Sequence, residues 1–266
     1  MRLAIYIANP GLRQNRQWIS LYEELSASHQ LYYVTGREDV QPDTDMLLSV
    51  GGDGTYLSAA QISTSCGIPI LGVNFGRLGF LSENAPDSIA APLLSGEFVI
   101  EDRDLLQVSV NGGEPRYAFN EVTVSRRGAV LIGVSVSLDG QSLPTYWADG
   151  LLVATSSGST AYSLSVGGPI CLPESKVLII SPIAPHNLNM RPLIVPSGTS
   201  IGMDFHSREQ GLILTADNST EVIDDRVHID ISVAQFSLKR VRLGKSNFIG
   251  ALRSKLFWGE DVRNEN

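Results

Sequence analysis

The sequence predicts an α/β domain followed by a second domain that is mostly β-structure. In the first hundred residues, short apolar runs alternate with stretches of helical periodicity, which is typical of a parallel sheet. Beyond about residue 100 the period changes to apolar–polar alternation, as in Val130–Leu138, and Asp139-Gly140 marks a hairpin turn. We therefore expect a Rossmann-like α/β domain over residues 1–100 and a β-sandwich-like domain over residues 101–243.

The first domain is expected to contain four strands and three helices. The segment 15–27 places Trp18, Leu21 and Leu25 on one helical face. The expected strands are Leu3–Ala8, Leu31–Val34, Met46–Val50 and Pro69–Val73, and the expected helices are Asn15–Ala27, Tyr56–Ser63 and Ile89–Leu94.

In the second domain, alternating segments predict strands of two packed sheets. Asn111-Gly112-Gly113 supplies a further turn after the first of them. The expected strands include the stretch around Leu106–Val110, Val130–Leu138, Ile201–Phe205, Leu212–Thr215, Val227–Val233 and Phe236–Leu243, and a last helix is expected over Phe248–Trp258.

Charge and cysteine content exclude several classes of function. The 266-residue chain carries a net charge of −8, so no surface-wide positive field exists to hold nucleic acid. Its two cysteines, Cys66 and Cys171, stand far apart without metal-ligand spacing, which favours free thiols in a reducing cytoplasm. The N-terminus lacks the features of a signal peptide, and no apolar run has the length of a membrane span, so we expect no membrane association.

The stretch Gly51-Gly52-Asp53-Gly54-Thr55 is a candidate phosphate loop. It follows a buried strand and precedes a helix, and a helix N-terminus offers N–H donors and a positive dipole end to an anion. A carboxylate beside phosphates is repulsive unless a metal neutralises the group or the aspartate has a chemical task, such as accepting a hydroxyl proton during phosphoryl transfer. The alternative is that Asp53 is a turn residue or helix cap.

Three further segments narrow the interpretation. They are GVNFGRLGFLSE at 72–83, FNEVTVSR at 119–126 and YWADGLLVATSSGSTAYSLSVGGPI at 146–170. With GGDGT, in this order, they resemble the NAD kinases, which phosphorylate the 2′-hydroxyl of the adenosine ribose of NAD. The resemblance covers nearly the whole chain, including PHNLNMRPL at 185–193.

The resemblance implies roles for individual residues. Asp53 matches the catalytic aspartate, and Gly52 and Gly54 are its nucleotide-binding neighbours. Asn120 and Glu121 match a pair that holds the nicotinamide-side ribose. The remaining binding residues implied are Asp149 at the nicotinamide end, Phe75 beside the adenine, Ser157, Thr160, Ala161, Tyr162 and Ser165 against the adenine and its ribose, and Asp217 and Asn218, where the family usually has Asp followed by Gly-Gln.

Each of these residues also has a plainer interpretation. Asn120-Glu121 fits a solvated pair at a strand edge, Asp149-Gly150 fits a turn, and Tyr162 fits a core aromatic residue. The sequence also departs from the family at Trp147, where many relatives carry a basic residue.

The resemblance implies the reaction ATP + NAD → ADP + NADP, with Mg²⁺ held mainly through the nucleotide phosphates and with no protein metal site. It implies that the tail from about residue 244 packs back on the first domain. It also implies a homodimer or homotetramer, in which the apolar, proline-broken segment 181–191 is covered by a neighbour.

Two rival functions remain. A lipid or diacylglycerol kinase shares the GGDGT loop, although the charge of −8 without a basic cluster speaks against a membrane-facing surface. A non-catalytic NAD sensor is the second, and the intact Asp53 speaks against it.

Overall fold

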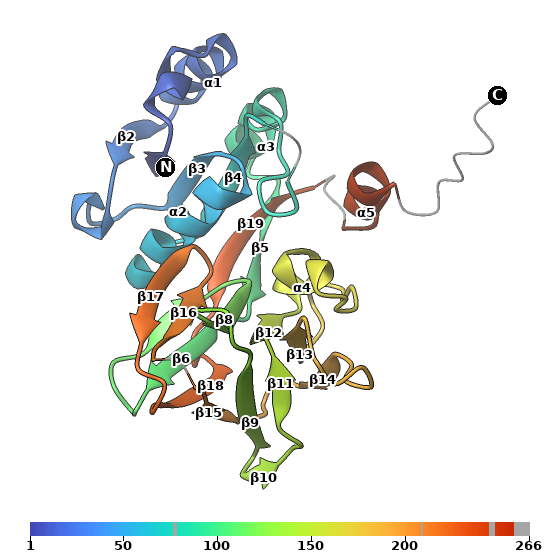
Figure 1. Cartoon of the computed structure of the whole chain (residues 1–266). Coiled ribbons are helices and arrows are strands. Elements are labelled where there is room, and N and C mark those ends of the chain that lie inside the picture. Colours follow the sequence, from blue (N-terminus) through green and yellow to red (C-terminus); the bar gives the residue numbers. More distant parts are fainter. Residues whose placement is uncertain (77–78, 209, 245–247, 258–266) are drawn as a thin grey trace, which may run out of the picture. The chain divides into compact units, whose positions relative to one another are not determined.

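The computed structural model describes residues 1–76, 79–208, 210–244 and 248–257, in two compact units (Figure 1). The first unit comprises Met1–Asp102 and Leu238–Asn266, and the second comprises Arg103–Ser237.

The first unit is built on a six-stranded sheet with the strand order β2-β1-β3-β4-β19-β5. The pairs β1–β2, β1–β3, β3–β4 and β4–β19 are parallel. Its strands are β1 (Arg2–Ile7), β2 (Gln30–Val34), β3 (Met46–Gly51), β4 (Ile70–Asn74), β5 (Phe98–Arg103) and β19 (Leu238–Leu243). Its helices are α1 (Arg16–Ser26), α2 (Asp53–Cys66), α3 (Ala90–Ser95) and α5 (Phe248–Leu256), with 3-10 turns η1 (Pro10–Gln14), η2 (Arg37–Asp39) and η3 (Pro86–Ser88).

Helices cover both faces of this sheet, which is why its central strands β3 and β4 are buried along their whole length. Neighbouring residues Leu47 and Leu48 of β3 point to opposite faces, and both are fully buried. Leu48 belongs to the core that also contains Trp18 of α1 and Leu93 of α3. Helix α2 packs against β3, β4 and β19. Asn15 starts α1 by accepting hydrogen bonds from two backbone N–H groups of its first turn.

One predicted strand belongs to a different sheet from the expected one. The segment Phe236–Leu243 was expected in the β domain, and it does contain a strand, β19. However, β19 lies beside β4 in the parallel sheet, with Arg240 opposite Ile70. The first unit therefore resumes at Leu238, before the expected limit at residue 243. The apolar–polar alternation of β19 is compatible with a strand in either sheet, so only the observed strand pairing shows to which sheet it belongs.

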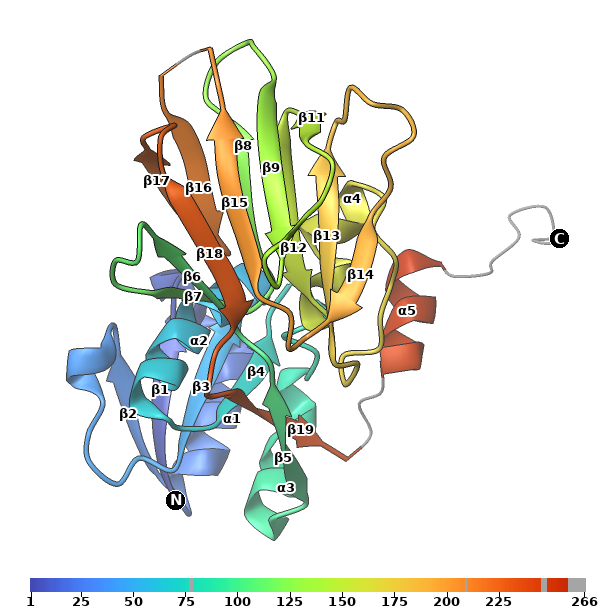
Figure 2. The same ribbon diagram turned by 90° about the horizontal axis from the view of Figure 1, so that it is seen from below.

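The second unit contains two antiparallel sheets (Figure 2). One has the order β10-β9-β15-β18-β6-β7 with β11 paired to β9, and the other has the order β14-β13-β12-β8-β16-β17. The first sheet consists of β6 (Leu106–Val110), β7 (Arg116–Ala118), β9 (Ile132–Leu138), β10 (Gln141–Ser142), β11 (Tyr146–Ala148), β15 (Ile201–His206) and β18 (His228–Val233). The second consists of β8 (Glu121–Arg126), β12 (Gly150–Thr155), β13 (Val177–Ile183), β14 (Leu193–Pro196), β16 (Leu212–Ala216) and β17 (Ser219–Ile223).

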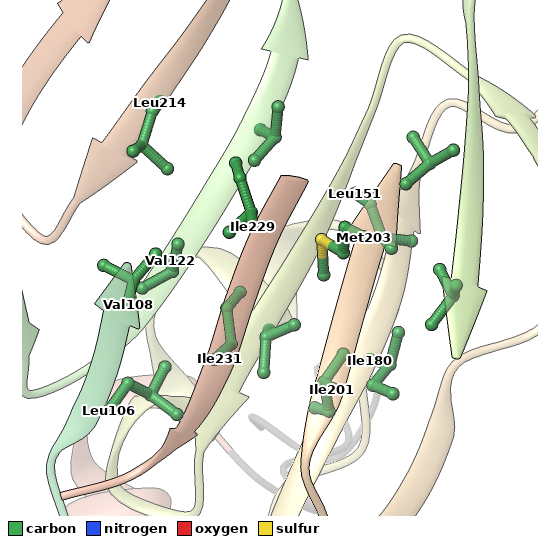
Figure 3. Close-up of a cluster of buried hydrophobic side chains, with 14 of the residues drawn as sticks. Leu106, Val108, Val122, Leu151, Ile180, Ile201, Met203, Leu214, Ile229 and Ile231 are labelled. Carbon is green, nitrogen blue, oxygen red and sulfur yellow. The ribbon is translucent and has the colours of Figure 1, made fainter. Parts of the chain in front are cut away.

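The inner faces of the two sheets share one apolar core (Figure 3). Ile201 and Ile231 come from one sheet, and Leu151 and Ile180 from the other, and all four are almost fully buried. This is the arrangement of a β-sandwich. The strand β13 continues through Pro182, which stands opposite Leu151, and ends at Ile183. The sequence suggested that proline breaks the segment 181–191, but Pro182 does not interrupt this strand.

The predicted fold class is confirmed: a parallel α/β unit is joined to a unit of packed antiparallel sheets. The helix expected over Tyr56–Ser63 is longer than predicted and begins at Asp53. The helix expected over Phe248–Trp258 ends at Leu256, and Trp258 lies outside the described residues. In the described part of the chain, no helix combines the length and the apolar character that crossing a bilayer requires.

Candidate active site

The GGDGT stretch forms the tight connection between β3 and α2. Gly51 has φ +153°, and a Cβ there would lie 2.4 Å from the Thr55 Oγ1 atom, so this position requires glycine. A Cβ added to Gly52 or Gly54 would have no neighbour within 4 Å. The first turn of α2 is therefore open, and it presents N–H groups and the positive end of a 14-residue helix. This geometry suits an anionic ligand.

Asp53 stands in the first turn of α2, and its carboxylate is held by the backbone. The N–H groups of Phe80, Leu81 and Ser82 donate to it at N···O distances of 2.8, 3.1 and 2.9 Å. Oδ1 accepts two of these bonds and Oδ2 accepts one, so Oδ2 keeps a lone-pair site. The carboxylate is consequently fixed in position without using its whole capacity to accept protons.

Gly79 is a site residue that sequence reasoning missed. A Cβ at Gly79 would lie 1.8 Å from Asp53 Oδ1 and 2.3 Å from its Cγ, so only glycine leaves room for the carboxylate. Ser82 ties the same segment to the loop, because its hydroxyl donates to the Gly51 carbonyl at 3.1 Å. The glycine-rich GRLGF stretch was a signal for such a close approach.

Phe75 leaves the sheet at the same edge as the loop. Gly51 and Asn74 are partners in the β3–β4 register, and Phe75 follows Asn74 directly. Its ring makes an edge-on contact with Trp18, with 6.3 Å between the centroids. In parallel sheets, ligands bind outside the carboxyl ends of the strands, where these residues lie.

In the second unit, Asp217 organises the Asn120-Glu121 pair. Its carboxylate accepts hydrogen bonds from the N–H groups of Phe119, Asn120 and Glu121 at 2.6, 2.8 and 3.2 Å. Asp217 occupies the β16–β17 turn together with Asn218, at φ +51°. Sequence reasoning expected Asp217 to bind a ligand, whereas in the structure its carboxylate holds the backbone that carries Asn120 and Glu121.

Glu121 is an unusual carboxylate. Burial raises its pKa to about 7, the nearby charge of Asp217 acts in the same direction, and the backbone N–H of Tyr162 opposes both. The atoms Glu121 Oε2 and Asn120 Oδ1 are buried and have no hydrogen-bond partner among the described residues. Unsatisfied buried acceptors are costly, so both atoms are suited to accept hydrogen bonds from a ligand.

The segment after β12 packs against the same pair. The Thr155 hydroxyl donates to the Phe119 carbonyl at 2.7 Å and accepts from the Gly158 N–H at 3.0 Å. A Cβ at Gly158 would lie 2.1 Å from the Asn120 carbonyl oxygen, so Gly158 is a second glycine that sequence reasoning missed. The 3-10 turn η4 (Ser157–Thr160) and the short helix α4 (Tyr162–Ser165) follow, and they carry the predicted residues Ser157, Thr160, Ala161, Tyr162 and Ser165.

Tyr162 is not the core residue of the plainer interpretation, because 42% of it is exposed. Its backbone nevertheless approaches Glu121. Aromatic side chains in such positions offer a face on which a base can stack.

Asp149 lies away from Glu121, at the other end of the β8–β12 pair. The register aligns Ala154 with Glu121 and Gly150 with Ser125, a separation of four residues or about 13 Å along the strand. Both carboxylate oxygens of Asp149 receive hydrogen bonds from Arg126, at 2.7 and 3.2 Å. Arg126 therefore fixes Asp149. The two positions can serve two ends of a long ligand.

Among the described residues, no three His, Cys, Asp or Glu side chains gather as a metal site.

Comparison with known proteins gives one family. Residues 15–95 match the ATP-NAD kinase N-terminal domain, and residues 119–243 match the ATP-NAD kinase C-terminal domain. An NAD kinase from Porphyromonas gingivalis is 41% identical over 262 residues, covering 96% of this chain and 90% of the relative. An NAD kinase from Flavobacterium psychrophilum is 38% identical over 253 residues, covering 92% and 86%.

Two solved structures are similar to the whole chain. An NAD kinase from Archaeoglobus fulgidus in complex with ATP has a TM-score of 0.77 and 28% identity, and the match covers 96% of this chain and 99% of that one. Yeast NADH kinase complexed with NADH has a TM-score of 0.88 over 100% and 90% of the two chains, and at 23% identity it supports the fold alone.

Proposed function

Because the chain belongs to the NAD kinase family, we propose that Asp53 is the base of its phosphoryl transfer. The chain is an NAD kinase, a phosphotransferase that uses ATP to convert NAD into NADP. The predicted family membership is thereby confirmed, and the lipid-kinase and sensor alternatives are not favoured. The observation that carries the proposal is the Asp53 carboxylate at the N-terminus of α2, fixed by three backbone N–H groups.

The donor triphosphate binds along Gly51–Thr55 in this proposal. The N–H groups and dipole of α2 stabilise its charge, and the absence of side chains at Gly52 and Gly54 lets phosphates reach the backbone. The Archaeoglobus NAD kinase was solved in complex with ATP, which supports ATP as the donor here. Asp53 accepts the 2′-hydroxyl proton through the open lone-pair site of Oδ2 as the bond to phosphorus forms.

The acceptor dinucleotide is held by groups of the second unit. Asn120 and Glu121 accept hydrogen bonds from a ribose, which satisfies the two buried oxygens that have no partner in the described part of the chain. Asp149, fixed by Arg126, binds the nicotinamide end at the far end of β8. Tyr162 contacts the adenine, together with the other predicted residues of η4 and α4. In the first unit, Phe75 is the residue that we assign to the adenine.

We propose that Mg²⁺ would be held mainly by the nucleotide phosphates, which are its usual ligands in kinase sites. The ion would offset the charge of the phosphates. Ligand binding and proton acceptance, as described above, use residues of the chain itself. We also propose that the enzyme works in the cytoplasm, where its two free thiols stay reduced.

Assembly into a homodimer or homotetramer is the last part of the proposal. Within the segment 181–191, Leu188 is 85% exposed and the backbone of Ala184 has φ +46°. In this proposal Leu188 packs against a second copy of the chain, which would cover it.

The experiment that tests the activity uses purified protein with ATP, Mg²⁺ and NAD. NADP formation is followed with an NADP-specific dehydrogenase, and a parallel reaction offers diacylglycerol in vesicles as the acceptor. We expect NADP and no phosphorylated lipid. Phosphorylated lipid without NADP would support the lipid-kinase alternative, and binding of NAD without turnover would support the sensor.

A further inference from the structure

The C-terminal helix α5 brings a buried cation to the phosphate loop. The Lys255 Nζ atom lies 4.2 Å from the centroid of the Phe80 ring, and Phe248, at the start of the same helix, also packs on Phe80 at 6.1 Å between centroids. The Nζ atom is buried and has no hydrogen-bond partner among the described residues. An ammonium group in this state is costly unless nearby charges compensate it.

The charged groups that face Lys255 come from three other elements. Asp53 on α2 and Glu83 after β4 act on it as anions, and Arg240 on β19 acts on it as a cation. Arg240 forms a largely buried ion pair with Glu83. With Glu83 paired in this way, Asp53 is the carboxylate left for Lys255 to compensate.

Phe80 connects this cation directly to Asp53. Its ring makes a cation–π contact with the Lys255 ammonium, and its backbone N–H donates a hydrogen bond to Asp53 Oδ2. The ammonium therefore lies next to the segment that fixes the carboxylate. It belongs to the chain's C-terminal helix, far along the sequence from the loop it serves.

A lysine at this position reduces the repulsion that is expected between Asp53 and the donor phosphates. A carboxylate within a phosphate loop repels the polyanionic donor, and the repulsion is strongest in a partly buried site. A positive charge beside the carboxylate cancels much of that repulsion and leaves the oxygens free to accept a proton.

We propose that Lys255 is a positioning residue for the donor nucleotide: its ammonium offsets the charge of Asp53 so that the donor phosphates can bind at Gly51–Thr55. This inference rests on the proposed role of that loop as the phosphate site. It predicts that affinity for ATP depends on the charge of Lys255, whereas affinity for NAD does not.

The charge of Lys255 can be removed by titration, which makes the test sharp. Burial lowers the pKa of Lys255 to about 8, and Arg240 acts in the same direction against the two carboxylates. The lysine therefore loses its charge as the pH rises through about 8, whereas an arginine at the same position keeps its charge throughout.

The experiment measures KM for ATP, KM for NAD and kcat from about pH 6.5 to about pH 9.5, a range that spans the lysine titration, with NADP quantified by chromatography. The proteins are the wild type, Lys255→Met, Lys255→Arg and the control Lys239→Met, which removes an exposed lysine of the same unit. At about pH 7, Lys255→Met is expected to raise KM for ATP roughly tenfold. Its KM for NAD and that of the control should change less than about twofold.

In the wild type, KM for ATP should rise through about pH 8 towards the value of Lys255→Met, while Lys255→Arg stays flat. An unchanged KM for ATP in Lys255→Met, or the same rise with pH in the wild type and Lys255→Arg, overturns the inference. The wild-type titration does not depend on a variant that folds. A wild type that makes no NADP refutes the function itself, which is a different result from an active enzyme whose KM ignores Lys255.

Discussion

Substitution of Gly79 by alanine is the most direct test of how the structure fixes Asp53. The new Cβ would lie 1.8 Å from Asp53 Oδ1, whereas non-bonded atoms need about 3.3 Å or more, so the carboxylate must retreat by about 1.5 Å. Its hydrogen bonds of 2.8 to 3.1 Å cannot survive such a shift. Gly79 does not need a left-handed backbone, so the effect comes from the contact alone.

The expected loss of kcat follows from this displacement. A misplacement of about 1 Å in a reacting group costs about 10²-fold in rate, and Gly79→Ala should therefore lower kcat by at least that factor. Initial rates of NADP formation measure it, and thermal unfolding shows whether the fold persists. The matched control is Gly76→Ala in the same loop, where a Cβ would have no atom closer than 3.8 Å. A Gly79→Ala enzyme with kcat within about threefold of the wild type would refute the close fit.

Four further outcomes are expected. Asp53→Asn should lower kcat by about 10²–10⁴-fold with little change in KM for NAD, and a near-normal kcat would show that Asp53 is not the base. The pKa of Glu121 is about 7, so its ionised fraction rises from about one tenth at pH 6 to about nine tenths at pH 8. Calorimetry should therefore show that NAD binds more tightly as the pH rises over this range. A Glu121→Gln protein should show no such trend. Gly158→Ala should lower the melting temperature and weaken NAD binding, because its Cβ meets the Asn120 carbonyl at 2.1 Å, whereas Gly198→Ala, with open space around it, should do neither. Light scattering should give a mass at least twice 28.8 kDa, and a fully active monomer would contradict the proposed assembly.

The pH dependence of Glu121 also has a consequence for stability. Its pKa is raised in the folded protein, from 4.5 to about 7, so folding favours the protonated form. The stability that this provides is complete below about pH 4.5 and is lost as the pH rises through 7. Ionisation of Glu121 therefore has two opposite effects as the pH rises: it strengthens NAD binding, and it lowers the stability of the ligand-free protein.

The sequence by itself determined the fold class and part of the secondary structure. Periodicity and turn residues are local properties, and they placed β3, α1 and the sandwich strands β6, β9, β15, β16 and β18 close to their observed limits, whereas most strands of the second sandwich sheet were not predicted. The glycines around Asp53 were also a local signal, because the strand-to-helix connection requires glycine at Gly51 and stays open at Gly52 and Gly54. The segments that resemble the family identified the candidate residues without any knowledge of their packing.

Only the tertiary structure decided which groups act on those residues. The three donors that hold Asp53 lie 27 to 29 residues away in the chain, and those that Asp217 holds lie 96 to 98 residues away. The sheet that β19 joins and the approach of Lys255 to Phe80 depend likewise on packing between distant segments. A pattern of residues fixes the local backbone, but a hydrogen bond or a charge contact across the fold exists only when packing has brought both partners together. For this reason the sequence identified the Asp53 carboxylate, whereas only the structure identified its partners.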